Sequence, residues 1–210
     1  MRRENFNLRE HCVSVALTDD IDVNVFLCGN KEIDDYFHNE ALLYGSEMLS
    51  RNFVFITDDG MCDVVSMFSL CNYSIDMMSV PGHIKNRLQR KIPNTKRKRS
   101  YPALLIGRLG VDSSFRGLGI GSQVIDYIKW LCIHPSNVGM CRYLVVDAIN
   151  TPNVIRFYES NGFTMLFGSE EEEEKSSSGI SPASVLRTRK MYCDLKLWMR
   201  EVLGDSVENV

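Results

Sequence analysis

Three alternating glycines, Gly117, Gly119 and Gly121, are the feature that most limits what this chain can fold into. They follow an apolar stretch, 102–111, that is typical of a strand buried on both faces, and they precede a stretch with apolar residues at helical spacing. Glycines let backbone N–H groups turn toward a ligand, and the free N–H groups of a helix's first turn favour an anion. With Arg116 beside them, they predict an anion site at a helix start, although a tight turn without a ligand explains the glycines about as well.

Two familiar phosphate-binding motifs are excluded by the details of this run. A nucleotide-triphosphate loop ends in Gly-Lys-Ser/Thr, whereas Gly121 is followed by Ser122 and Gln123, without the lysine. A dinucleotide-binding fold places its glycine motif near the first strand, with an acidic residue about 20 positions later. Here the run lies in the middle of the chain, so neither ATP nor NAD is the expected ligand.

The elements expected around the run indicate a mixed α/β sheet. Asn30 can cap a helix over 31–48, and Asp58-Asp59-Gly60 predicts a hairpin turn between two antiparallel strands. The second half alternates strand and helix, which predicts a parallel strand pair at the centre. The expected strands cover 11–17, 52–57, 62–73, 102–111, 142–149, 163–167 and 185–197, and a short helix over 152–161 is closed by Gly162.

Two segments are expected to interrupt a single domain that covers residues 1–210. A basic insertion near 84–100, broken by Pro93, predicts a short helix and a loop. An acidic and then serine-rich segment near 168–182 predicts a solvated, flexible loop. The basic run could neutralise several phosphates, although such runs are usually solvated loops. Its charged residues are Lys85, Arg87, Arg90, Lys91, Lys96, Arg97, Lys98 and Arg99.

Composition limits the class of protein further. The net charge of −3 argues against whole-protein attraction to nucleic acid or an anionic membrane, and no stretch approaches the roughly 18 apolar residues of a membrane span. Seven cysteines without CxxC spacing, and no signal peptide, predict a reducing, cytoplasmic location. Four scattered histidines show no metal spacing, so no metal is expected.

A second feature, Arg156-Phe157-Tyr158-Glu159 followed by Gly162-Phe163, lies about 40 residues after the glycine run. Together with Leu109-Gly-Val111-Asp112 and the Arg116–Gly121 loop, it resembles the GNAT (GCN5-related) N-acetyltransferase superfamily over roughly residues 104–167. The resemblance implies a GNAT-like, mostly antiparallel central sheet with a splayed parallel strand pair, and acetyl-CoA as co-substrate.

The resemblance also implies site residues. Leu109, Gly110 and Val111 match the strand that presents backbone groups to the pantetheine arm. Tyr158 matches a tyrosine near the thioester sulfur. Asn153 is carried over as the asparagine that bonds a pantetheine amide, although the usual spacing falls on Thr151, between Asn150 and Asn153. The loop implied to bind the pyrophosphate consists of Arg116, Gly117, Leu118, Gly119, Ile120 and Gly121, with Ser122 after it.

A narrower resemblance concerns the run from Phe26 to Asn30, the run from Ile33 to Tyr36, and Leu105–Asp112. These are similar to the GNAT branch that contains the tRNA-acetylating toxins of toxin–antitoxin modules. That branch implies aminoacyl-tRNA as an acceptor, contacted through the basic segment 85–99, and leaves a homodimer open. The branch also contains GNAT proteins of unknown substrate, so small-molecule and protein amines stay open as acceptors.

Acetyl transfer needs a neutral amine, a polarised thioester carbonyl and a proton for the departing thiolate. A backbone N–H near Leu109–Val111 can polarise the carbonyl. Tyr158 is the candidate general acid, since a phenol with a pKa of about 10 keeps its proton at neutral pH, but a core aromatic is the alternative. The residues that fit a general base by type alone, without a supporting motif, are Asp112, Asp147 and Glu159.

The sequence therefore predicts direct acetyl transfer from acetyl-CoA to a primary amine. The rival hypothesis is a non-catalytic GNAT-fold module that binds acyl-CoA or a protein partner. Arg108 is a further expectation, because an arginine inside a buried strand needs a partner. It is expected to pair with an acidic side chain or to face the acceptor's phosphate.

Overall fold

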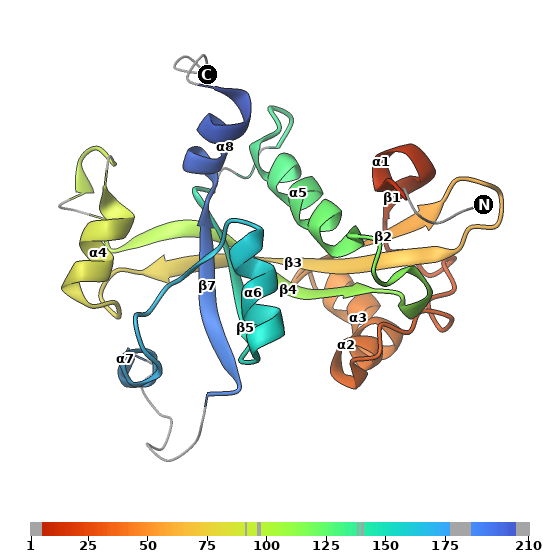
Figure 1. Cartoon of the computed structure of the whole chain (residues 1–210), viewed down its shortest axis with the longest axis horizontal. Coiled ribbons are helices and arrows are strands. Elements are labelled where there is room, and N and C mark those ends of the chain that lie inside the picture. Colours follow the sequence, from red (N-terminus) through yellow and green to blue (C-terminus); the bar gives the residue numbers. More distant parts are fainter. Residues whose placement is uncertain are drawn as a thin grey trace. The chain divides into compact units, whose positions relative to one another are not determined.

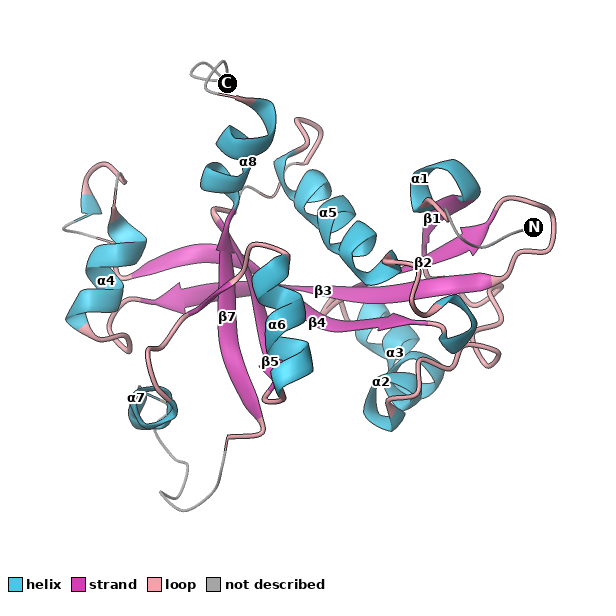
Figure 2. Cartoon of the chain, in the orientation of Figure 1, coloured by secondary structure: helices cyan, strands magenta, loops and turns pink. Residues whose placement is uncertain are grey.

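The computed structural model describes residues 6–90, 92–95, 98–137, 139, 141–176 and 186–204 (Figures 1 and 2). The chain divides into two compact units, the first formed by 1–72 and 106–130 and the second by 73–105 and 131–210. Strands β3 (Val64–Asp76) and β4 (Ser100–Val111) contribute residues to both units.

Within the residues that the structure describes, seven strands form a mixed sheet in the order β1-β2-β3-β4-β5-β7-β6. One strand pair is parallel and the others are antiparallel, so the predicted α/β architecture is confirmed. None of the helices that the structure describes is both long and apolar enough to cross a bilayer.

In the first unit, β1 (Cys12–Ala16) pairs antiparallel with β2 (Arg51–Thr57), which pairs antiparallel with β3. Between β1 and β2 run α2 (Lys31–Asp35), a π-helical turn over Tyr36–Glu40 and α3 (Ala41–Ser46), where one helix is predicted. Asn30 is the predicted cap, and its side-chain oxygen accepts from the N–H of Glu32 and Ile33 at 3.0 and 3.4 Å. Helix α1 (Leu8–His11) is not predicted from the sequence.

The core of the first unit forms between these helices and the strands. The Tyr36 hydroxyl is buried and lies 3.1 Å from polar atoms of Ser50, Asn52 and Ser69, so its polar group is satisfied. The buried apolar members of this cluster are Val23, Phe26, Cys28, Tyr36, Phe37, Ala41, Val54, Val64 and Met67. The unit also contains the short turn Ser113–Phe115 and most of α5 (Ile120–Ile133).

In the second unit, β5 (Tyr143–Ile149) pairs antiparallel with β7 (Thr188–Asp194), as Figure 2 shows. Strand β6 is only two residues long, Thr164–Met165, and pairs with the other edge of β7. Helix α4 (Gly82–Gln89) and α6 (Pro152–Ser160) match the predicted helices, with Gly162 at a φ of 79° after α6. The buried cluster consists of Ile75, Met77, Val80, Ile84, Leu88, Tyr101, Ala103, Tyr143, Val145, Leu166, Phe167 and Tyr192.

The prediction of a loop throughout 168–182 is wrong for its first part. Glu170–Ser176 forms helix α7, because Glu173 is buried and its carboxylate accepts from Arg189 Nε at 2.8 Å and from the Lys190 N–H at 2.7 Å. Residues 177–182 lie outside the described residues. The prediction of one long final strand is also wrong, since β7 ends at Asp194, whose carboxylate caps α8 (Leu195–Leu203).

Candidate functional site

The predicted anion loop, Arg116–Gly121, leads from the Ser113–Phe115 turn into α5 in the first unit. Gly117 and Gly119 have φ values of 78° and 70°, a region that L-residues rarely adopt. A Cβ at either glycine would meet no atom within 4 Å, so the space in front of the loop is open. The N–H groups of the helix's first turn lack intrahelical acceptors. The loop therefore offers backbone donors, and the positive end of a helix dipole, to an anion.

Asp112 fixes the entry to this loop. One carboxylate oxygen accepts from the Leu27 N–H at 3.0 Å, and the other from the N–H and hydroxyl of Ser114 at 2.9 and 2.6 Å. Burial acts to raise the pKa of Asp112, but these donors and the nearby charge of Arg116 outweigh it and hold the pKa below its ordinary value. Both of its oxygens are engaged by donors of the turn and of Leu27, so Asp112 is a poor general base.

The Arg116 side chain contacts residues 26–30, which we call the 26–30 segment. Its Nη2 donates to the carbonyl oxygen of Cys28, and a Cβ on Gly29 would lie 2.6 Å from the same nitrogen. Gly29 adopts a φ of 76°, so glycine suits this position for both reasons. A guanidinium carries five N–H donors, so others remain for an anion.

Gly110 in β4 packs closely against the same segment. A Cβ there would lie 2.9 Å from Phe26 Cζ and 3.0 Å from Cys28 Cβ, and the Gly110 carbonyl accepts from Ser66 Oγ at 2.7 Å. The Asp112 N–H donates to the Val65 carbonyl at 3.0 Å, so the main-chain N–H and carbonyl groups of residues 110 and 112 point toward β3. Because strand residues alternate, the N–H groups of Leu109 and Val111 point to the opposite edge.

Arg108 differs from one of its two predictions, the acidic partner, whereas a contact with the acceptor's phosphate stays a prediction. Its side chain is exposed, its Nη1 donates to the neighbouring Gly107 carbonyl at 2.8 Å, and its Cζ lies 5.2 Å from the centre of the Tyr36 ring. A cation–π contact at the surface replaces the expected acidic partner, since β4 is not buried on both faces here.

Tyr158 belongs to α6 in the second unit. Its ring is buried and packs edge-on against Phe157 and Phe163, with centroid distances of 5.0 and 5.3 Å. Within the described part of the chain, its hydroxyl has no hydrogen-bond partner, and burial raises the pKa of Tyr158 above its ordinary value. The phenol therefore stays protonated at neutral pH, as a general acid requires.

The two asparagines near the start of α6 differ in what they bind. Thr151 is the N-cap residue, and the Asn150 amide donates to the Leu186 carbonyl at 2.9 Å and to Glu170 at 3.1 Å. Asn153 is exposed, and its side-chain oxygen accepts from Arg156 at 2.9 Å, which leaves its amide N–H groups available.

The two remaining general-base candidates show no catalytic arrangement within the second unit. The Asp147 carboxylate forms an ion pair with Lys190, and Glu159 is exposed on α6. No described residue therefore stands out as the general base.

The basic segment contains one clearly structural residue. Arg87 donates to the carbonyl oxygens of Met165 and Leu166 at 2.9 and 2.7 Å and lies over the Tyr192 ring. Lys98 lies over the Tyr101 ring, with Nζ 5.7 Å from its centre. The residues Lys91, Lys96 and Arg97 lie outside the described residues.

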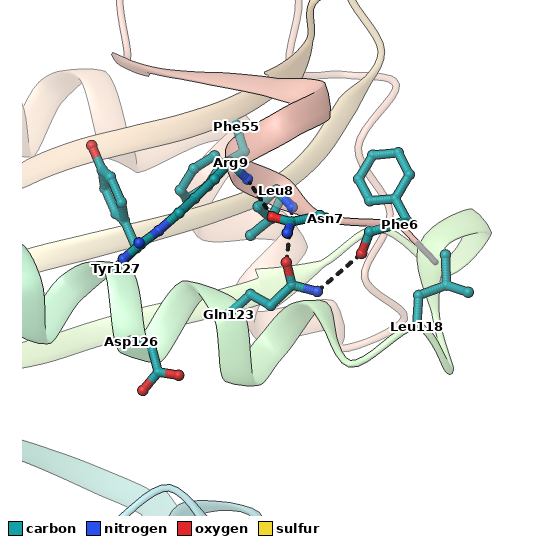
Figure 3. A pocket seen from close by; sticks show the side chains of 9 residues that line it. All are labelled: Phe6, Asn7, Leu8, Arg9, Phe55, Leu118, Gln123, Asp126 and Tyr127. Atoms are coloured by element: carbon teal, nitrogen blue, oxygen red, sulfur yellow. Dashed lines mark hydrogen bonds between the residues drawn. The ribbon is translucent and has the colours of Figure 1, made fainter. Parts of the chain in front are cut away.

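Sequence reasoning missed two residues that lie beside the loop in the first unit. Gln123 and Phe6 lie beside it and form walls of a cavity of about 600 Å³ that Leu118 also lines (Figure 3). Their partners are far away in sequence, so no local pattern could have revealed them.

A mixed sheet with a glycine-rich loop at the start of α5 is the arrangement that the predicted resemblance implies. Residues 88–165 match the family model of the acetyltransferase (GNAT) domain. This match bears out the predicted resemblance to the GNAT superfamily over residues 88–165.

A curated relative, a tRNA-acetylating toxin of Mycobacterium tuberculosis (strain ATCC 25618 / H37Rv), is 28% identical over 134 residues, which is 64% of this chain and 74% of the relative. Among solved structures, AtaT complexed with acetyl-methionyl-tRNAfMet has a TM-score of 0.64 at 21% identity, with 91% of this chain and 98% of that chain covered. A tyrosine-to-phenylalanine variant of KacT has a TM-score of 0.67 at 16% identity, with 91% and 99% covered. These structures share the fold.

Proposed function

We propose that this chain transfers an acetyl group from acetyl-CoA to the α-amino group of an aminoacyl-tRNA. The observation that carries the proposal is the open, left-handed Gly117–Gly119 backbone at the N-terminus of α5, inside the stretch that matches the GNAT domain. The acceptor class is supported by the relative that is a tRNA-acetylating toxin and by AtaT complexed with acetyl-methionyl-tRNAfMet. AtaTR has also been solved with acetyl-CoA, at 20% identity to this chain.

The chain's own residues supply distinct parts of the reaction in this proposal. The backbone donors of residues 117–122 hold the pyrophosphate, with Arg116 as an additional cation. An N–H of Leu109 or Val111, on the edge of β4 that faces away from β3, polarises the thioester carbonyl. The amide of Asn153, which Arg156 leaves free, is assigned to the pantetheine arm.

Tyr158 supplies the proton for the leaving group. The amine nitrogen attacks the thioester carbon, the C–N bond forms as the C–S bond breaks, and the phenol gives its proton to the sulfur. The amine's proton passes to water, which then restores the phenol. An aminoacyl ester has an α-amine of lower pKa than a lysine side chain, so water suffices as the base.

Radiolabelled acetyl-CoA with a mixture of aminoacyl-tRNAs tests the reaction. We expect thiol release and an acetylated aminoacyl group by mass spectrometry, with none from uncharged tRNA. Tyr158→Phe should lower kcat by about 10²-fold or more while the affinity for acetyl-CoA stays unchanged. Tight acetyl-CoA binding with no thiol release from any amine would favour the non-catalytic module instead. If affinity and kcat fall together, Tyr158 is a packing residue.

The biological role follows from the same proposal. AtaT has been solved with the C-terminus of its antitoxin, AtaR, which supports a toxin of a toxin–antitoxin pair. Expression of this chain should arrest growth, and Tyr158→Phe should relieve the arrest. Continued growth during expression of active enzyme would contradict the toxin role without touching the chemistry.

A further inference from the structure

The side chain of Gln123 holds the N-terminal segment of the chain with both of its polar atoms (Figure 3). Its Oε1 accepts from the Leu8 N–H at 2.8 Å, and its Nε2 donates to the Phe6 carbonyl at 3.1 Å. Gln123 lies in the first turn of α5, two residues after Gly121. Two backbone groups more than 100 positions away in sequence are thus bound directly behind the candidate anion loop.

Phe6 contacts the other end of the same loop. Its ring lies 5.3 Å from the ring of Phe115, the residue that immediately precedes Arg116, and 5.2 Å from the His11 ring. Leu8 is 2% exposed, so the segment is fixed in the core of the first unit. Residues 6–8, which we call the N-terminal strap, therefore touch the chain just before and just after the Arg116–Gly121 loop.

We propose that the N-terminal strap is a positioning element for the anion loop, with Gln123 and Phe6 as its positioning residues. A loop with three glycines loses more conformational entropy on ordering than other sequences do. Contacts that order it before the ligand arrives reduce the cost of binding. The choice of acetyl-CoA as the ligand rests on the proposed function, whereas the effect of the strap on the loop does not depend on it.

Hydrogen–deuterium exchange tests the strap without any ligand. In Gln123→Ala and Phe6→Ala, the amides of 117–122 should exchange about tenfold faster than in the wild type, while the amides of β2 and β3 keep their protection. Asn39→Ala is the matched control, because Asn39 is exposed in the same unit and its side chain donates to Asp35 at 2.7 Å, outside the strap and the loop. That variant should exchange like the wild type. Unchanged exchange of 117–122 in both strap variants would overturn the proposal.

Calorimetry connects the strap to the ligand. Both strap variants should bind acetyl-CoA about 5- to 10-fold more weakly than the wild type. They should bind acetylpantetheine, which lacks the pyrophosphate, as the wild type does. Equal weakening for both ligands would indicate general structural damage and refute the positioning role. If the wild type binds no acetyl-CoA, the proposed function fails, while the exchange experiment still decides on the strap.

A graded variant keeps the test valid if Gln123→Ala does not fold. Gln123→Glu retains the acceptor for the Leu8 N–H and loses the donor to the Phe6 carbonyl, so its loop exchange should lie between those of the wild type and Phe6→Ala. A double variant of Phe6→Ala and Gln123→Glu should exchange little faster than Phe6→Ala alone if both residues act through one strap. Fully additive rate increases would contradict a single strap.

Discussion

Replacement of Gly110 by alanine probes how the candidate site is held together. The added Cβ would lie 2.9 Å from Phe26 Cζ, 3.0 Å from Cys28 Cβ and 3.1 Å from Cys28 Sγ. Phe26 is 0% exposed and Cys28 7% exposed, so neither can rotate into solvent. The 26–30 segment has to move away from β4.

The expected loss of stability is about 2 kcal/mol, since forced overpacking of a closed core typically costs about 1–3 kcal/mol. For a chain of this length, that lowers Tm by about 4–8 °C. The movement also affects the anion loop, because the Leu27 N–H binds Asp112 and the Cys28 carbonyl accepts from Arg116. We therefore expect weaker acetyl-CoA binding in addition to the lower Tm.

Gly107→Ala is the matched control on the same strand. Its Cβ would meet Cys71 Sγ at 3.4 Å and Ser69 Oγ at 3.7 Å, which are ordinary contacts. Both substitutions reduce the entropy of the unfolded chain equally, so their difference isolates the packing effect. Thermal unfolding followed by circular dichroism measures both, and calorimetry measures acetyl-CoA affinity.

A second-site change sharpens the experiment. Phe26→Leu removes the ring atom closest to the new Cβ, so the double variant with Gly110→Ala should lose less stability than the sum of the two single variants. A Tm for Gly110→Ala equal to that of Gly107→Ala would refute the reasoning, because it would show that the 26–30 segment yields without cost.

Three further outcomes are expected. Glu173→Gln breaks the buried ion pair with Arg189 and should lower the free energy of unfolding by about 3 kcal/mol, which corresponds to a Tm about 6–12 °C lower. An unchanged Tm would mean that α7 does not contribute to stability. Burial, with a hydrogen bond to Asp34, raises the pKa of Cys28 to about 11. Its alkylation by iodoacetamide, measured by peptide mass spectrometry, should therefore be negligible at pH 8 and increase as the pH approaches about 11. Rapid labelling at pH 8 would contradict this. The double variant Arg90→Glu with Lys98→Glu should weaken tRNA binding and reduce its salt dependence. Arg87→Ala should mainly lower Tm, because Arg87 binds two main-chain carbonyls. If the tRNA affinity of all variants has the same salt dependence, the basic segment does not contact tRNA.

Local sequence patterns predicted most of the fold. The Asn30 cap, the hairpin at 58–60, the helix after the glycine run and Gly162 after α6 depend on interactions within a few residues, so their signals are visible in the sequence. The prediction of a loop over the glutamates at 170–174 was wrong, because it used only the local sequence. Its helix depends on Arg189, a partner 16 residues from Glu173 that no local pattern reveals.

The candidate site divides in the same way. The left-handed φ values of Gly117 and Gly119 were predictable, because glycine is the residue that adopts them without strain. The contacts that restrain the loop were not predictable, because they join residues far apart in the sequence. Gln123 binds Phe6 and Leu8, and Arg116 binds Cys28. Asp112 was a candidate base by residue type, and only its three donors identify it as part of the turn.

The contacts that hold the loop are made to main-chain atoms, so they depend little on which side chains those atoms carry. The loop offers backbone N–H groups to an anion, and Arg116 and Gln123 hold it through backbone atoms of other segments. The side chain of the half-buried Leu118 can then vary without loss of the donors, whereas the φ values of Gly117 and Gly119 cannot. The sequence pattern therefore detects the glycines, whereas the side chains that reach a neighbouring main chain are found only in the folded structure.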